Sequence, residues 1–156
     1  MKQTVFVTGG SRGIGLATAR KFSEKGWCVA SFYKTSPGPK VPNCKYYQVD
    51  VGNLKNVEEV FSQAFKDHKR IDCLVNNAGV FAYKKSLAEF DEELIDKVIS
   101  VNEKGVYFCT KAILDKMVNG SIVNVSSTVA QVGGSDPIYS GTKAAVLGFT
   151  KSMAKS

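Results

Sequence analysis

The sequence predicts an α/β protein in which helices cover both faces of a parallel β-sheet, giving three layers. Short apolar, β-branched segments alternate along the chain with segments of helical periodicity, which is the pattern of a doubly wound sheet. A glycine-rich turn joins the first strand to the first helix, and polar residues end several later strands. Because doubly wound sheets bind ligands at the carboxyl ends of their strands, these polar residues mark a candidate binding edge.

The composition indicates a single domain without a membrane anchor. The chain has 156 residues, of which 44% are hydrophobic, enough for one substantial core but too few for two domains. We therefore expect one domain over residues 1–156. No apolar run reaches the length of a membrane span, and the run at residues 5–7 is too short for a signal peptide. We expect a cytoplasmic protein with no membrane partner.

Charge and cysteine usage argue against two other classes of function. The net charge is +7, but the lysines are spread along the chain and do not interleave densely with aromatic residues, so we expect no nucleic-acid partner. The four cysteines form no C-x-x-C pair, which favours free thiols over a metal site. The single histidine, His68, is expected at an exposed helix end and outside any catalytic role.

The first strand, turn and helix predict a nucleotide-binding unit. Residues 4–7 form the predicted strand, T-G-G-S-R-G-I-G occupies residues 8–15, and a helix follows as far as Gly26. Glycines lack Cβ atoms and so let the backbone approach a pyrophosphate, which the free N–H groups of the helix N-terminus bind. The predicted cofactor-binding residues of this turn are Gly9, Ser11, Arg12, Gly13, Ile14 and Gly15.

The end of the second predicted strand, residues 27–33, bears on the choice of cofactor. An acidic residue here would bind the ribose 2′-hydroxyl of NAD, but no Asp or Glu occurs between Lys25 and Asp50. Lys34 follows the strand, and Arg12 lies in the glycine-rich turn. Two cations without a carboxylate suit the 2′-phosphate of NADP, so we expect NADP(H) in preference to NAD(H), with Lys34 in the cofactor site.

Three more strands and their helices complete the predicted fold. The strands lie at residues 45–49, 71–75 and 121–125. Asn53 and Asp91 are placed to cap two helices, and helical periodicity runs over residues 103–117. Pro137 suits the first turn of the last helix, which carries Tyr139.

Tyr139 and Lys143 are four residues apart on this last helix, so their side chains share one face. An ammonium beside a phenol favours the phenolate, and a tyrosine in that setting can give or take a proton. Ser126 and Ser127, which end the preceding strand, are placed to hold a substrate oxygen. The spacing alone also fits a solvated pair on an ordinary amphipathic helix, so the remaining motifs decide between the two interpretations.

Five motifs follow one another along the chain in an order that resembles the short-chain dehydrogenase/reductase family. They are the turn at residues 8–15, Asp50-Val51, N-N-A-G at residues 76–79, V-N-E-K-G at residues 101–105, and a serine pair followed by Y-S-G-T-K at residues 139–143. The resemblance covers essentially the whole chain and is to 3-oxoacyl carrier-protein reductases in particular. It implies a Rossmann-type doubly wound α/β/α fold.

The resemblance implies hydride transfer between a nicotinamide and a carbonyl compound or secondary alcohol, with a small molecule as substrate. It makes Tyr139 the general acid, supported by Lys143, which also holds the nicotinamide ribose. It makes Asn102 the anchor of a proton-relay water. It gives Ser127 the substrate oxygen, although the distance in sequence to Tyr139 is one residue shorter than is common in the family, which leaves Ser126 as an alternative.

The same resemblance completes the cofactor site and suggests an assembly. Asp50 and Val51 are expected to contact the adenine. The further cofactor-site residues that it implies are Asn76, Ala78, Gly79, Tyr139 and Lys143. The family assembles through two long helices, here residues 103–117 and the helix that begins before Tyr139, so we expect a homodimer or homotetramer.

The chain departs from the family in its length. It stops at Ser156, within the helix that carries Tyr139, whereas typical members continue into further strands and a substrate-covering segment. We therefore expect the C-terminal strands to be missing and the strand at residues 121–125 to be an exposed apolar edge. The alternative function is a non-catalytic dinucleotide-binding or assembly module of the same fold, in which substrate turnover is weak or lost.

Overall fold

A five-stranded parallel sheet forms the centre of the computed structural model, which describes residues 2–83 and 86–155. The strand order is β3-β2-β1-β4-β5, which confirms the predicted doubly wound α/β fold. The strands are β1 (Thr4–Thr8), β2 (Cys28–Tyr33), β3 (Cys44–Gln48), β4 (Cys73–Asn76) and β5 (Ser121–Asn124). Because β4 pairs with β1 and not with β3, the switch point of the sheet lies between β1 and β4.

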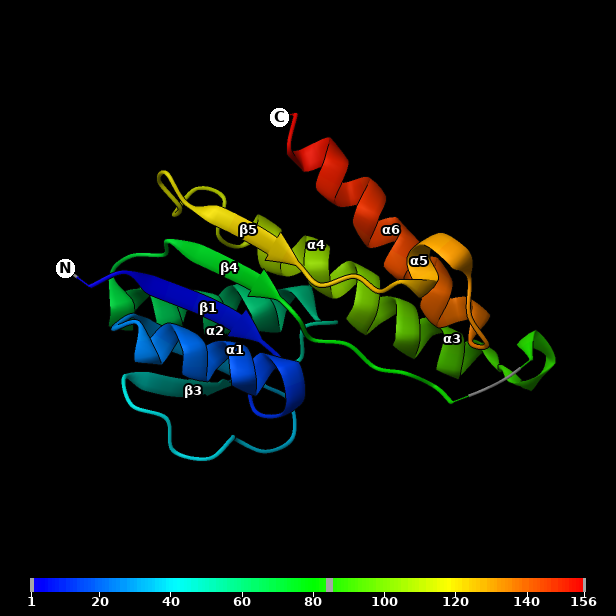
Figure 1. Cartoon of the computed structure of the whole chain (residues 1–156), viewed down its shortest axis with the longest axis horizontal. Coiled ribbons are helices and arrows are strands. Elements are labelled where there is room, and N and C mark those ends of the chain that lie inside the picture. The colour runs from blue at the N-terminus through cyan, green and yellow to red at the C-terminus, as the bar shows by residue number, and fades with distance from the viewer. Residues whose placement is uncertain (1, 84–85, 156) are drawn as a thin grey trace.

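Helices connect the strands and cover both faces of the sheet. The α-helices are α1 (Gly13–Glu24), α2 (Leu54–His68), α3 (Glu92–Ile99), α4 (Gly105–Lys111), α5 (Val129–Val132) and α6 (Pro137–Met153). A 3₁₀ turn, η1 (Leu87–Glu89), and a π-helical turn, η2 (Ser100–Lys104), lie between β4 and α4. Helices α3, α5 and α6 gather beyond the carboxyl ends of β4 and β5 (Figure 1), where the motif residues are expected.

The helix expected over residues 103–117 is shorter than its periodicity predicted. The π-helical turn η2 takes up its first residues, and α4 ends at Lys111. Beyond that point the N–H groups of Ile113 and Lys116 donate to carbonyls three residues back, a tighter pattern that ends the α-helix. The short helix α5 was not predicted at all, because its four residues give no periodic signal.

Alternate residues of the strands face opposite layers, as the pleat of a strand requires. Phe6 of β1 packs with Phe32 of β2 in a core that includes residues of α2. Val5 and Val7 face the other side and pack with residues of α1. The ring of Phe32 also stacks on that of Phe61 from α2, with centroids 4.4 Å apart. Two apolar layers thus pack against the two faces of the sheet.

The predicted helix starts are confirmed. Asn53 caps α2 and Asp91 caps α3, each accepting the backbone N–H three residues on, at 3.0 and 2.8 Å. Pro137 occupies the first turn of α6. The last helix therefore begins at a fixed point, two residues before Tyr139.

β5 forms one edge of the sheet, as expected, and Val123 on it is 49% exposed. An apolar strand at an edge offers unpaired backbone groups to another chain or segment. Within residues 2–83 and 86–155, no helix combines the length and the apolar character that crossing a bilayer requires.

His68 lies at the end of α2, as expected, but the expectation that it is exposed is wrong. Its ring packs against Phe6 and Tyr47, with centroids 6.3 and 6.2 Å apart. Nε2 is buried and has no hydrogen-bond partner within residues 2–83 and 86–155. Burial lowers the pKa of His68, which Asp67 partly offsets. The His68 ring is partly covered because the aromatic residues under α2 extend to its last residue.

We predict that His68 makes folding less favourable in mild acid. Because its pKa is lowered in the folded state, the unfolded chain takes up a proton first, near the ordinary histidine pKa of about 6.5, and stability is lost as the pH falls below that value. Urea unfolding of the wild type should show this loss between about pH 7.5 and about pH 5.5, and His68→Phe should remove it. Since the chain has one histidine, an equal slope in both proteins would contradict the prediction.

Candidate functional site

The backbone of the glycine-rich turn after β1 has a conformation that lets other atoms approach it closely. Gly9 and Gly13 have φ angles of +65° and +55°, which favour glycine over other residues. A Cβ atom on Gly15 would overlap the carbonyl oxygen of Gly9 and lie 2.5 Å from Nδ2 of Asn77. The backbone conformation therefore requires glycine at positions 9 and 13, and the close contact with Gly9 and Asn77 requires it at position 15. The N-terminus of α1 opens from this turn and presents its free N–H groups there.

Asn77 ties the turn to the end of β4. Its side-chain amide donates to the carbonyl oxygens of Thr8 and Gly9, at 2.9 and 3.2 Å. The hydroxyl of Thr8 accepts the N–H groups of Asn77 and Ala78, both at 3.0 Å. Asn77 was not predicted as a site residue, although it belongs to the N-N-A-G motif, because the family resemblance implied Asn76, Ala78 and Gly79 instead.

A cleft of about 710 Å³ opens at the carboxyl ends of β1 to β4. Most residues expected to bind the cofactor line it, namely Gly9, Ser11, Arg12, Gly13, Ile14, Lys34, Asp50, Val51, Ala78 and Gly79. Sequence reasoning missed others, namely Phe32, Tyr33, Thr35, Ser36, Val49, Asn77, Val80, Lys97 and Val101. Lys97 comes from α3, and no motif in the sequence places that helix beside the turn.

Four predicted residues lie outside the lining of this cleft, namely Gly15, Asn76, Tyr139 and Lys143. The amide of Asn76 donates to Oγ1 of Thr110 and to Oδ1 of Asn124, at 3.1 and 2.8 Å. The structure therefore directs this side chain toward α4 and β5 and does not bring it to the cleft. Its own Oδ1 is buried without a hydrogen-bond partner among the residues described.

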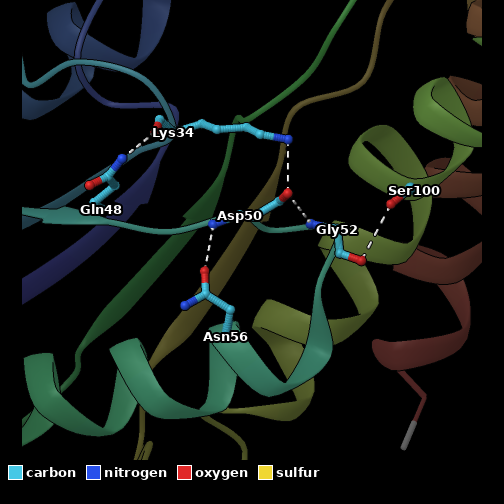
Figure 2. A network of polar contacts seen from close by, with 6 residues as sticks. All are labelled: Lys34, Gln48, Asp50, Gly52, Asn56 and Ser100. Carbon is cyan, nitrogen blue, oxygen red and sulfur yellow. Dashed lines mark hydrogen bonds and ion pairs between the residues drawn. The ribbon is translucent and has the colours of Figure 1, made fainter.

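Lys34 and Asp50 face each other in the cleft and form an ion pair (Figure 2). Their Nζ and Oδ2 atoms are 2.8 Å apart, and the two side chains are 61% and 41% exposed. Burial alone would raise the pKa of Asp50, but hydrogen bonds from Lys34 and from the backbone N–H of Gly52 lower it overall. An ion pair this exposed contributes little to stability, so it can open at small cost. The sequence indicated two cations here and did not reveal that one is paired.

Asn102 lies at the centre of the π-helical turn η2 and is fully buried. Its Oδ1 accepts the N–H of Val80 at 2.7 Å, and its Nδ2 donates to the Val80 carbonyl at 2.9 Å. Nδ2 also lies 3.3 Å from Oγ1 of Thr142 on α6. The π turn, a form that is frequent at functional sites, thereby joins the segment after β4 to the helix that carries Tyr139.

Lys143 and Tyr139 come together on α6. Nζ of Lys143 is 5.6 Å from the centroid of the Tyr139 ring and donates to the Val125 carbonyl at 2.9 Å. Lys143 is 4% exposed, and burial lowers its pKa. A Cβ atom on Gly79 would lie 3.7 Å from this Nζ and 3.4 Å from Oδ1 of Asn102. Gly79 lines the cleft, so the buried lysine lies directly beside the cleft wall.

The two serines after β5 differ in the bonds that they make. The hydroxyl of Ser126 donates to the Lys143 carbonyl at 2.8 Å, so its proton is committed to holding α6. The hydroxyl of Ser127 accepts the N–H of Val129 at 3.4 Å, which uses an oxygen lone pair and leaves its proton available. This difference favours Ser127 over Ser126 as a donor to a substrate oxygen.

Asp136, which sequence reasoning missed, caps the helix that carries the tyrosine. It is 1% exposed, and its Oδ1 accepts the N–H of Tyr139 at 2.9 Å. Its Oδ2 accepts the N–H of Ala82 at 3.2 Å. The D-P pair before Tyr139 was the available signal, since Asp is a preferred cap and Pro a preferred first residue. No group of three His, Cys, Asp or Glu side chains suited to a metal ion occurs in residues 2–83 and 86–155.

Comparison with known proteins gives a consistent result. Residues 3–156 match the short chain dehydrogenase family. The 3-oxoacyl-[acyl-carrier-protein] reductase FabG of Chlamydia pneumoniae is 34% identical over 167 residues, covering 97% of this chain and 66% of that protein. FabG of Thermotoga maritima is 37% identical over 166 residues, covering 96% of this chain and 65% of that protein.

A comparison with solved structures also finds a similar fold in a dehydrogenase. The ligand-free aldohexose dehydrogenase of Thermoplasma acidophilum aligns with a TM-score of 0.91 at 33% identity, covering 98% of this chain and 60% of that one. The chain thus spans 66% and 65% of the length of the two curated relatives above.

We predict that an added methyl group lowers the free energy of unfolding at a closely packed glycine and not at one with open space around it. Gly15→Ala should lower the free energy of unfolding by about 1–3 kcal/mol, because its Cβ meets backbone that cannot move freely. The matched control Gly148→Ala, on the exposed side of α6 with open space at its Cβ, should raise it by up to about 1 kcal/mol. Urea unfolding measures both, and equal effects would show that the turn is not closely packed.

Proposed function

Because the chain belongs to the short-chain dehydrogenase family, we propose that it is an NADP(H)-dependent oxidoreductase that interconverts a carbonyl compound and a secondary alcohol. One observation carries the proposal. A buried lysine ammonium lies 5.6 Å from the ring centroid of Tyr139 and beside Gly79, which lines the cleft. That arrangement supports a tyrosine that exchanges a proton at the end of a dinucleotide site.

The residues present fit a dinucleotide. The turn leaves no room for side chains at Gly9 and Gly15, the N-terminus of α1 faces it, and Arg12 and Lys34 line the cleft. When bound, the nicotinamide supplies or accepts the hydride. Asp50 and Val51 would contact the adenine in this arrangement.

In reduction, Tyr139 donates its phenolic proton to the carbonyl oxygen, and Ser127 hydrogen-bonds the same oxygen. Lys143 stabilises the phenolate left behind, and its bond to the Val125 carbonyl fixes the position of its charge. Asn102 holds Val80 and Thr142 in place. The N–H of Val80 uses one lone pair of its Oδ1, and the second is left for the relay water that the family resemblance assigns to it.

The preference for NADP(H) rests on charge. β2 ends at Tyr33 without a carboxylate, and Lys34 with Arg12 offers two cations. A 2′-phosphate would compete with Asp50 for Lys34, and it would do so successfully because it carries more charge than a carboxylate. We also propose a cytoplasmic location, a homo-oligomer and a substrate of the 3-oxoacyl thioester kind, the last because two relatives are named as such reductases.

A second candidate function is a dinucleotide-binding or assembly module without turnover. It is a candidate because these residues align with 66% and 65% of the length of two curated relatives, and the family resemblance implies a substrate-covering segment in the remainder. NADPH binding by the wild type without oxidation in the presence of any ketone or β-ketoacyl thioester would select the module over the enzyme.

We predict that Tyr139→Phe lowers kcat by about 10²–10⁴-fold while NADPH binding is retained, because only the proton donor is lost. The measurement is NADPH oxidation with a panel of ketones and β-ketoacyl thioesters, beside a cofactor titration by fluorescence. Tyr107→Phe is the matched control, since its hydroxyl bonds Glu103 and lies outside the cleft. Full activity in the Tyr139 variant would exclude the mechanism.

We predict that Lys34→Ala weakens NADPH binding by about tenfold and leaves NADH binding nearly unchanged, since one charge-assisted bond to the 2′-phosphate is lost. Lys21→Ala is the control, because this lysine is also exposed and ion-paired but belongs to α1 outside the cleft. If Lys34→Ala weakened the binding of NADPH and NADH equally, Lys34 would not contact the 2′-phosphate.

A further inference from the structure

Two aromatic side chains follow the cleft-lining residue Val80, and the mechanism above uses neither. Phe81 is 38% exposed and Tyr83 is 83% exposed. The Phe81 ring meets the Tyr139 ring edge to face, with centroids 5.1 Å apart and planes at 81°. The Tyr83 ring meets the Phe81 ring in the same way, at 4.8 Å and 89°. The three rings form a row that runs outward from Tyr139.

The backbone on both sides of Phe81 is held by buried side chains. Asn102 holds the N–H and the carbonyl of Val80, at 2.7 and 2.9 Å. Asp136 holds the N–H of Ala82 at 3.2 Å while its other oxygen caps the helix of Tyr139. The backbone around Phe81 is therefore held by the same two residues that anchor and cap α6, and from this backbone the ring meets that of Tyr139.

Tyr83 supports a functional interpretation of this row. Its φ angle of +59° lies in the left-handed region, which is costly for a bulky residue. Such conformations persist where the surroundings enforce them and are concentrated at ligand sites. Here the strained residue presents an almost fully exposed ring next to Phe81.

Aromatic rings held in this way select for shape. A flat aromatic group gains from edge-to-face or offset-stacked contact with them, beyond the burial of its area, whereas a puckered ring of equal size gains burial alone. A ring row that begins at a proton donor would hold the substituent on the carbonyl carbon while the oxygen reaches the phenol.

We propose that Phe81 and Tyr83 form the wall of the substrate site and select, among 3-oxoacyl thioesters and simpler ketones alike, those that carry an aryl group on the reacting carbonyl carbon. This inference rests on the proposed function. In the step that it serves, a hydride from NADPH bonds to the carbonyl carbon, the C=O π bond breaks, and its oxygen takes the Tyr139 proton. The ketone is reduced to a secondary alcohol and the cofactor is oxidised to NADP⁺.

The test compares acetophenone with cyclohexyl methyl ketone, which have the same number of carbon atoms but differ in the flatness of the ring. Dissociation constants for the NADP⁺-loaded protein are measured by ligand-observed NMR, and kcat/KM by NADPH oxidation. The variants are Phe81→Leu, Phe81→Tyr and, as a remote control that also loses one partly buried ring, Phe65→Leu on α2.

The wild type should favour acetophenone by about tenfold. Phe81→Leu should bring the ratio of the two dissociation constants close to one without changing cofactor affinity, while Phe81→Tyr and Phe65→Leu should keep the wild-type ratio. A wild type without preference, no detectable binding of either ketone, or a ratio that survives Phe81→Leu would overturn the proposal. Binding that follows these expectations without turnover by the wild type would refute the proposed function and leave the aromatic wall supported.

Discussion

The arrangement of the site depends on one buried amide. Asn102 has no exposure to solvent, and its three hydrogen bonds to described residues go to other segments, two to Val80 after β4 and one to Thr142 on α6. An unmade bond of a buried backbone group costs about 1–3 kcal/mol, so this amide stabilises the alignment of both segments strongly. The π-helical turn makes the contact possible, because a regular helix from α3 to α4 would place residue 102 at another angle.

The two ends of the site are built in different ways. Around Gly9 and Asn77 the turn and β4 are locked by backbone contacts, which suits a pyrophosphate that must always bind in one place. At Lys34 and Asp50 the contact is an exposed ion pair (Figure 2), which can exchange partners. Under the proposed function, the rigid turn would hold the pyrophosphate in one place, and the adjustable charge at Lys34 would meet the 2′ position of the adenosine ribose.

The strands and most helix starts could be predicted from the sequence because each has a local signal. Apolar runs marked the strands, and Asn53, Asp91 and Pro137 marked helix starts through side-chain and ring chemistry that acts within one turn. The motifs also predicted, as cofactor-binding residues, ten of the residues that line the cleft. These strands, helix starts and motif residues could be predicted because the sequence pattern that specifies each lies within a few residues of it.

The remainder depends on contacts between distant segments. The pairing of Lys34 with Asp50, the partial burial of His68 and the presence of Lys97 in the cleft all follow from packing that no local pattern encodes. Asn76 was predicted from its motif as a cofactor residue, but its side chain bonds Thr110 of α4 and Asn124 of β5 and does not line the cleft. The cap bond from Asp136 to Tyr139 had a local signal in the D-P pair, but only the fold reveals that Asp136 also bonds Ala82 in the segment after β4.

The central claim is that hydride passes between a nicotinamide and a carbonyl carbon beside Tyr139. The most direct measurement uses NADPH that carries deuterium at C4, incubated with the protein and an aryl ketone, followed by mass spectrometry of the alcohol. The account predicts one deuterium on the carbinol carbon from one of the two C4-labelled epimers and none from the other. Alcohol without deuterium from either epimer, or no alcohol while the labelled cofactor binds, would contradict it.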